Sequence, residues 1–175
     1  MILCRSLIFL LLLACGFARA EILHGVVVGV SDGDTITVLD AGNQQHKIRL
    51  AGIDAPEKKQ DFGQRSKEHL SQLVFGKQVE VEWKKLDRYK RVIGKVWVAP
   101  PSCKKPDCPK IVDACLAQIS MGLAWWYEKY AKEQPEADRR QYELVESEAR
   151  SKRIGLWSSK EPIPPWEFRH AKHER

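Results

Sequence analysis

Three short polar segments contain the residues with the clearest chemical potential. The first, residues 31–35, places Asp32 and Asp34 on either side of a glycine. Aspartate and glycine favour turns, so a plain turn between two strands is the simpler interpretation of this segment alone. The same two carboxylates also offer the hard oxygen ligands that Ca²⁺ or Mg²⁺ prefers.

The second segment places one arginine and two acids around a proline. Arg49 lies near the end of a predicted strand, and Asp54 and Glu57 lie in the loop after it. Pro56 restricts Ala55 to an extended conformation, which keeps this loop from turning helical. Taken alone, the segment also suits a structural interpretation, in which the arginine pairs with a surface acid and the aspartate caps a turn.

The third segment, residues 87–91, has four charged residues around Tyr89. A solvated hairpin tip is the ordinary explanation for such a run. A basic loop with an aromatic residue can also hold a phosphate and stack on a base. Both interpretations stay open for this segment by itself.

Taken together, the three segments have the chemistry of phosphodiester hydrolysis. Asp34 and Asp54 supply ligands for a hard cation, and Glu57 can orient or deprotonate a water molecule. Arg49 and Arg91 can hold phosphoryl oxygens with a rigid fork of donors that lysine lacks. The five histidines show no zinc-binding spacing, so zinc chemistry is not expected.

Periodicity predicts five strands and three helices in one domain. Alternating apolar residues indicate three strands within residues 23–50 and one each over residues 79–83 and 92–98. Helices are predicted over residues 63–76, 112–121 and 135–155. This pattern favours an α+β, mainly β fold built on a small closed barrel, although an open sheet with helices on one side fits the same pattern.

The first twenty residues have the pattern of a secretory signal peptide. An apolar run over residues 7–14 is followed by Ala18 and Ala20 at the positions that a signal peptidase reads. A membrane anchor is the alternative, but the run is short for a bilayer of ~30 Å. Cys15 ends a possible lipoprotein box and would then carry a lipid anchor. The expected mature protein is exported, periplasmic or secreted, with no stable membrane span.

Removal of this leader leaves a positive balance of charge. The net charge falls from +6 to +4, because two arginines and no acid lie in residues 1–20. A positive chain suits a polyanionic partner without proving one. The expected organisation is a signal peptide over residues 1–20, one domain over residues 21–158 and a tail over residues 159–175 that wraps the surface or is partly disordered.

Three cysteines remain after the leader. Cys103 and Cys108 bracket a short polar loop, and an oxidising compartment favours a disulfide between them. A metal-binding knuckle is the alternative, but it needs further ligands. Cys115 lies in an apolar helical stretch and is expected to be a buried thiol.

The three polar segments, in this order and spacing, resemble the thermonuclease, or staphylococcal-nuclease-like, family. The matching segments are residues 32–35, 49–57, 87–91 and, late in the chain, 155–157. The resemblance extends over residues 23–158. It implies an OB-fold barrel of five strands with three helices. It also implies calcium-dependent cleavage of DNA and RNA to products with 3′-phosphates and 5′-hydroxyls, by a protein expected to be a monomer.

The resemblance assigns a role to each motif residue. Asp34 and Asp54 would bind calcium through their carboxylates, and Ala55 would bind it through its backbone carbonyl. The remaining assignments are Arg49, Glu57 and Arg91 as the catalytic set, Arg88 and Tyr89 beside the substrate phosphate and sugar or base, and Asp32 as support near the metal.

Two features depart from the family pattern or extend it. Lys90 stands where glycine is usual, so a left-handed backbone there would strain it and could shift the loop of Arg91. At least two of the aromatic residues after the second helix are expected in the core, and Tyr127 or Tyr130 is a candidate for stacking on a base. These aromatic residues are Trp125, Trp126, Tyr127 and Tyr130. The alternative function is a non-catalytic OB-fold module that binds nucleic acid.

Overall fold

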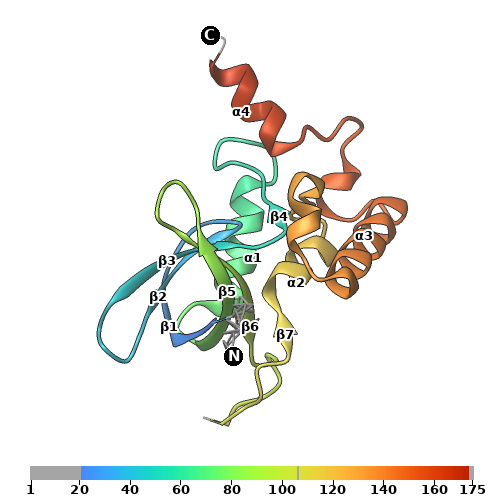
Figure 1. Cartoon of the computed structure of the whole chain (residues 1–175). Helices are drawn as coiled ribbons and strands as arrows, with labels where there is room; N and C mark the ends of the chain where they lie inside the picture. The colour runs from blue at the N-terminus through green and yellow to red at the C-terminus, as the bar shows by residue number, and fades with distance from the viewer. Residues whose placement is uncertain (1–20, 106, 174–175) are drawn as a thin grey trace, which may run out of the picture.

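The computed structural model describes residues 21–105 and 107–173 (Figure 1). The predicted leader, residues 1–20 with Cys15, lies outside the described residues, so the signal peptide and the lipid anchor stay predictions. Within the described part of the chain, no helix combines the length and apolar character needed to cross a membrane.

The first half of the chain consists mainly of strands, and the second half is mainly helical. The first half contains β1 (Glu21–Asp32), β2 (Thr35–Leu39), β3 (Gln45–Leu50), β4 (Ile53–Asp54), α1 (Gly63–Val74), β5 (Gln78–Leu86) and β6 (Val92–Val98). The second half contains β7 (Val112–Asp113), α2 (Ala114–Ser120), β8 (Trp125–Trp126), the 3₁₀ helix η1 (Glu128–Glu133), α3 (Glu136–Ser151), the 3₁₀ helix η2 (Gly155–Ser158) and α4 (Pro165–His173).

Five strands close into a barrel. Antiparallel pairs join β3 to β2, β2 to β1, β1 to β5 and β5 to β6. A parallel pairing of β3 with β6, with Arg49 opposite Ile93, completes the circuit. This pairing confirms the predicted five-stranded barrel and excludes the open sheet. The closure also places the end of β3 beside the start of β6. Arg49 lies near the end of β3, and Arg91 directly precedes β6.

The barrel interior is filled by branched apolar side chains, because such residues pack well on a pleated surface. α1 and α2 pack on the barrel, and each buries an apolar face against it. The fully buried side chains include Val27, Ile36, Val38, Ile48, Val79, Val81, Val96, Leu70, Val74 and Ile119. This continuous core makes the barrel a rigid support for the polar loops at its rim.

Two boundaries differ from those predicted, and each difference has a local cause. Residues 112–113 pair with β6 as β7 and do not open the second helix. The Asp113 side chain then caps α2 by accepting the backbone N–H groups of Cys115 at 2.9 Å and Leu116 at 3.1 Å. β5 continues to Leu86, beyond the predicted end at residue 83, by pairing with the first residue of β6.

The third predicted helix is confirmed as α3, and the tail adds a fourth helix. α3 buries Tyr142 and Ala149 as its apolar spacing predicts, and it also buries Glu146. α4 lies at the top of Figure 1, above the loop that joins β4 to α1. The tail therefore does not simply wrap the surface, since its last part is helical and approaches the polar rim.

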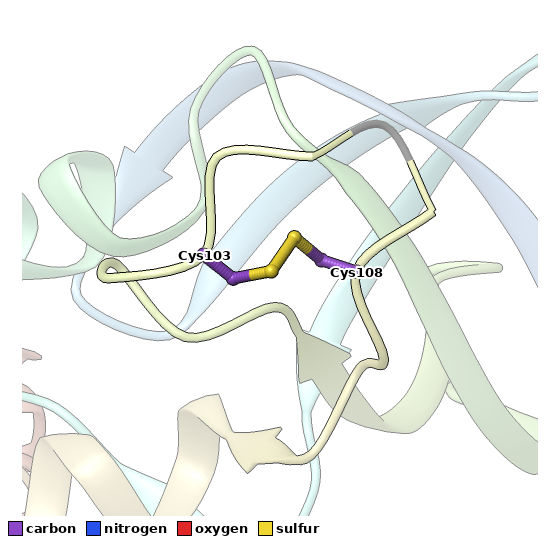
Figure 2. The surroundings of a disulfide bond; sticks show 2 residues. All are labelled: Cys103 and Cys108. Atoms are coloured by element: carbon purple, nitrogen blue, oxygen red, sulfur yellow. A yellow bond between two sulfur atoms is a disulfide. The ribbon is translucent and has the colours of Figure 1, made fainter.

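Cys103 and Cys108 form the predicted disulfide, with their Cα atoms 6.1 Å apart (Figure 2). The loop that they close lies at the bottom of Figure 1, at the opposite end of the molecule from α4. Cys115 is a free and buried cysteine, also as predicted. Burial raises the pKa of its thiol, so this cysteine stays protonated at neutral pH.

Candidate active site

The turn between β1 and β2 holds the first polar segment in one conformation. The backbone N–H of Asp34 donates to Oδ1 of Asp32 at 3.2 Å, so Asp32 supports the turn. Gly33 lies against Ser66 and Ala55 so closely that any Cβ there would overlap them. Glycine is therefore required for this close packing and not for an unusual backbone angle.

A buried glutamine that sequence reasoning missed also fixes this turn. Gln118 of α2 is fully buried, and its amide nitrogen donates to the carbonyl of Gly33 at 2.6 Å and that of Ser66 at 3.0 Å. The Ser66 hydroxyl in turn donates to the carbonyl of Leu123 at 2.6 Å. A polar residue inside an apolar helix was the one available signal, but its partners lie 52 and 85 residues away.

The carboxylate of Asp34 is buried and fully engaged. Its Oδ2 accepts the backbone N–H of Ala55 at 2.6 Å, and its Oδ1 accepts the hydroxyl of Thr35 at 3.2 Å. Its Oδ1 also pairs with Nη1 of Arg49. The first segment thus contacts the second through both a backbone and a side-chain partner.

Asp54 lies on β4, which pairs with β8 and places Asp54 opposite Trp125. Its side chain is 1% exposed, and its Oδ1 accepts from Nη2 of Arg49 at 2.5 Å. One guanidinium therefore joins the carboxylates of Asp34 and Asp54. The predicted grouping of these three residues is present in the structure.

Glu57 lies in the loop after Asp54, and its side chain is 40% exposed. Two bonds to Gln60 hold its backbone: its N–H donates to Oε1 at 3.1 Å, and its carbonyl accepts from the Gln60 N–H at 2.8 Å. Gly63 at the start of α1 lies directly against the Glu57 carbonyl, where a Cβ would overlap it. The carboxylate of Glu57 can thus meet solvent while its backbone stays fixed.

The hairpin over residues 87–91 is organised by Asp87. This carboxylate accepts the backbone N–H groups of Tyr89 at 2.8 Å and Arg91 at 2.9 Å, and Nε of Arg91 at 2.7 Å. Burial alone would raise the pKa of Asp87, but these bonds lower it below its ordinary value. Lys90 has φ of 61°, the left-handed backbone that was expected to strain it.

The partner of the Arg91 side chain in this structure is local. Among the described residues its ion pair is with Asp87, and none is with Asp34, Asp54 or Glu57. Its guanidinium lies 5.4 Å from the centre of the Tyr89 ring, and that of Arg88 lies 4.7 Å from the same ring. The predicted substrate residues Arg88 and Tyr89 therefore form one cationic and aromatic cluster with Arg91.

A hollow of about 420 Å³ connects this hairpin with the first turn. Its wall contains Asp32, Thr35, Tyr89 and Arg91, so the structure brings the first and third segments to one surface. Two lysines that the sequence analysis did not single out, Lys47 and Lys58, complete the lining together with Ser31. Lys47 could have been found from strand alternation, because it stands two residues before Arg49 on the same face of β3.

The aromatic stretch after α2 divides as expected between core and surface. Trp125 and Trp126 are buried, whereas Tyr127 is half-buried and Tyr130 is exposed. Burial and, to a smaller degree, the negative charge of Asp54 raise the pKa of Tyr127. The face of Tyr127 stacks on Trp166 of α4, with ring centres 5.3 Å apart and planes 10° from parallel.

Arg169 of α4 is the largest feature that the sequence analysis missed. Its Nη2 donates to Oδ2 of Asp54 at 2.7 Å, and its Nη1 donates to Oε1 of Glu57 at 2.8 Å and to Oδ1 of Asp54 at 3.2 Å. Burial by itself would lower the pKa of Arg169, but the bonds to Asp54 and Glu57 raise it. Nothing in the charged tail sequence distinguishes this arginine from its neighbours.

The residues at this rim suit a hard divalent cation. Two buried carboxylates, Asp34 and Asp54, lie within reach of one guanidinium, and both now neutralise positive groups. In the described part of the chain no three acidic, histidine or cysteine side chains form a metal-binding group. A cation here would thus take two carboxylates and fill its shell with the Ala55 carbonyl and water, which is normal for calcium or magnesium.

Comparisons with known proteins identify the family of this chain. The profile of the family described as staphylococcal nuclease homologue matches residues 47–159. The chain is 42% identical to Protein ParB of Escherichia coli over 154 residues, which cover 87% of this chain and 82% of that protein. It is 40% identical to the Micrococcal nuclease of Shigella flexneri over 148 residues, which cover 85% and 81%. It is 38% identical to an uncharacterized endonuclease of Haemophilus influenzae over 163 residues, which cover 93% and 80%. The chain therefore belongs to the staphylococcal nuclease homologues, and it is a nuclease.

Proposed function

We propose that this nuclease is exported and that it hydrolyses the phosphodiester bonds of DNA and RNA in a calcium-dependent reaction. The observation that carries the proposal is the bridge from Arg49 to the buried carboxylates of Asp34 and Asp54. Buried negative charges need a counter-charge, and two aspartates at one rim form a strong site for a cation. A calcium ion held there would stabilise negative charge on the phosphoryl group.

The residues of the chain divide the remaining work. Asp34 and Asp54 would hold the cation with the backbone carbonyl of Ala55. Glu57 would orient a water molecule or accept its proton, since its carboxylate is 40% exposed and its backbone is fixed. Arg49 would hold a non-bridging phosphoryl oxygen from the inner side of the site.

The hairpin would hold the substrate from the other side. Arg91 lines the hollow next to Asp32 and Thr35, where its guanidinium could leave its present partner Asp87 and bind a phosphate of the substrate instead. Arg88 and Tyr89 would contact the neighbouring phosphate and the sugar or base. The water oxygen would bond to phosphorus as the bond to the 5′ oxygen breaks, which leaves a 3′-phosphate and a 5′-hydroxyl.

Export is supported by two independent features. The first twenty residues have the order of a signal peptide, with an apolar run and a small-residue cleavage site. The Cys103–Cys108 disulfide belongs to the described part of the chain and suits an oxidising compartment. Lipidation at Cys15 would instead leave the protein attached to a membrane, and the mass of the mature N-terminus distinguishes the two cases.

The direct test is digestion of DNA and RNA by the purified protein, with calcium and then with a calcium chelator. We expect release of acid-soluble nucleotides with calcium only. Product ends give a second readout: 5′-hydroxyls accept a phosphate from a polynucleotide kinase without prior phosphatase treatment. Undiminished cleavage in the chelator would refute the calcium assignment, and binding of DNA without cleavage would favour the non-catalytic OB module.

A matched pair of variants locates the site. Asp54→Asn removes one negative charge from the buried rim, whereas Asp61→Asn removes one from the exposed loop before α1. We expect the first to lose cleavage by a factor of about 10² or more, and the second to keep it. Equal activity of the two variants would contradict the proposed centre.

A further inference from the structure

The helix α4 lies outside the region that the family profile matches, and yet it contacts the centre of the site. The profile ends at residue 159, and α4 spans Pro165–His173. Its Arg169 forms ion pairs with Asp54 at 2.7 Å and with Glu57 at 2.8 Å. An element added after the matched domain therefore supplies a cation to two residues of the proposed catalytic centre.

The bonds from Arg169 leave few free lone pairs on the carboxylate of Asp54 for another cation. Both oxygens of this carboxylate accept from Arg169, and Oδ1 also accepts from Arg49. The side chain of Asp54 is 1% exposed. A metal ion needs the same lone pairs that these guanidinium groups now use, so Arg169 and a divalent cation would compete for Asp54.

Three further contacts hold α4 in this position. Nε2 of Gln60 donates to the carbonyl of Ile163 at 2.5 Å, just before the helix begins. Trp166 stacks on Tyr127 and also meets Trp125 edge to face, with ring centres 5.6 Å apart. Trp166 thus packs on Trp125 and Tyr127, and it covers the ring face of Tyr127.

These contacts are partial, so α4 can move without loss of the core. Trp166 and Arg169 are half-buried, and the side chain of Arg169 is 39% exposed. Pro165 is buried and Trp166 and Phe168 are half-buried, and Arg169 lies one turn after Pro165. Release of the helix would expose Pro165, the stacked ring of Trp166 and the guanidinium of Arg169, a small cost beside the barrel core.

We propose that Arg169 is an internal counter-cation, and that α4 thereby holds the nuclease in a closed state that calcium binding opens. The inference rests on the proposed function, because it takes Asp54 as a ligand of the cation. In the closed state Arg169 neutralises Asp54 and Glu57, and Trp166 covers Tyr127. Calcium at Asp54 displaces Arg169, which frees the Glu57 carboxylate and the face of Tyr127 together.

The first test measures calcium affinity by isothermal titration calorimetry of the purified protein, without any substrate. Arg169→Ala removes the competing charge, and we expect it to bind calcium about tenfold more tightly than the unmodified protein. Arg169→Lys keeps one point charge and should fall between them. Arg140→Ala is the matched control, since it removes an arginine whose side chain is 72% exposed on α3, and it should leave the affinity unchanged.

The second test follows α4 itself by hydrogen exchange with mass spectrometry over residues 160–173. Without calcium, the unmodified protein should protect this segment and Arg169→Ala should exchange faster. Calcium should accelerate exchange in the unmodified protein and change it little in the variant. Equal or weaker calcium binding by Arg169→Ala, or exchange in α4 that does not respond to calcium, would overturn the proposal.

Asp54→Asn distinguishes this failure from failure of the proposed function. If Asp54→Asn abolishes calcium binding while Arg169→Ala binds like the unmodified protein, the metal assignment stands and the role of Arg169 is wrong. If Asp54→Asn binds calcium normally, the cation lies elsewhere, and both proposals fall. The calcium-free difference in α4 exchange between Arg169→Ala and the unmodified protein is independent of both outcomes, because it reports the contribution of Arg169 without any metal.

Discussion

The backbone N–H of Ala55 donates a hydrogen bond of 2.6 Å to Oδ2 of Asp34, a residue 21 positions earlier in the chain. This bond joins the first polar segment to the second without using the side chain of residue 55. Alanine therefore serves at this position as well as a polar residue would. It also fixes Asp34 relative to Asp54, so that the two carboxylates meet the single guanidinium of Arg49.

Arg49→Lys tests whether this bridge requires a planar fork. Lysine keeps the charge, but it cannot donate two bonds in the geometry that joins Asp34 and Asp54. We expect kcat to fall by a factor of about 10²–10³, with the fold retained. Steady-state kinetics and circular dichroism measure the two quantities. Arg140→Lys on the exposed face of α3 is the control, and a kcat near that of the control would refute a role for the fork.

Gln118→Leu should reduce stability and activity together. The substitution leaves the buried carbonyl of Gly33 without its donor, which costs about 1–3 kcal/mol, and it loosens the turn that carries Asp34. Urea unfolding gives the first effect, and cleavage at a temperature well below unfolding gives the second. Gln64→Leu replaces an exposed amide on α1 and should be nearly neutral. A stable Gln118→Leu variant with full activity would show that the turn holds its own shape.

Asp87→Asn should change how stability depends on pH. The folded-state pKa of Asp87 lies below its ordinary value of 3.8, so its charged form stabilises the fold above that pH. This contribution is lost as the pH falls through the lowered pKa. We expect the variant to be less stable by about 0.5 kcal/mol at pH 7, with a difference that shrinks below about pH 3.8. Urea midpoints across this range measure it, with Asp61→Asn as control. A difference that stays constant at all pH values would contradict the assignment.

Replacement of Cys103 and Cys108 by serine should separate stability from catalysis. The disulfide closes a short loop and restricts the unfolded chain, which stabilises the fold by about 2 kcal/mol. The loop lies at the opposite end of the molecule from α4 and the rim (Figure 1), so cleavage should be unchanged at temperatures where the variant is folded. Loss of activity without loss of fold would show that the loop contacts the substrate.

The strands and most of the site could be predicted because their signals are local. Alternating apolar residues indicate the barrel strands, and Arg49, Asp54 and Glu57 stand within nine positions around one proline. The left-handed backbone at Lys90 was also foreseeable, since glycine is usual at this position of the family that the sequence resembles. These features depend on neighbours in the chain and need no knowledge of the tertiary structure.

The missed residues act through contacts that span the chain. Arg169 meets Asp54 across 115 positions, and Gln118 meets Gly33 across 85. Neither has an apolar period or a motif around it that indicates a partner. Arg91 differs for another reason: its sequence position suits the site, but Asp87 four residues earlier holds its guanidinium in this structure.

The seam between β3 and β6 has a consequence for how activity appears during folding. Arg49 lies opposite Ile93 in this parallel pair, and Arg91 stands just before β6 begins. The two arginines come from segments 42 positions apart, and neighbouring strands lie about 4.8 Å apart only after they have paired. In a refolding chain that has formed its hairpins but not this strand pair, the two arginines are therefore not yet held close together in one site. The recovery of cleavage after dilution from denaturant should report the last long-range pairing of the barrel, and it should lag behind the return of hairpin structure.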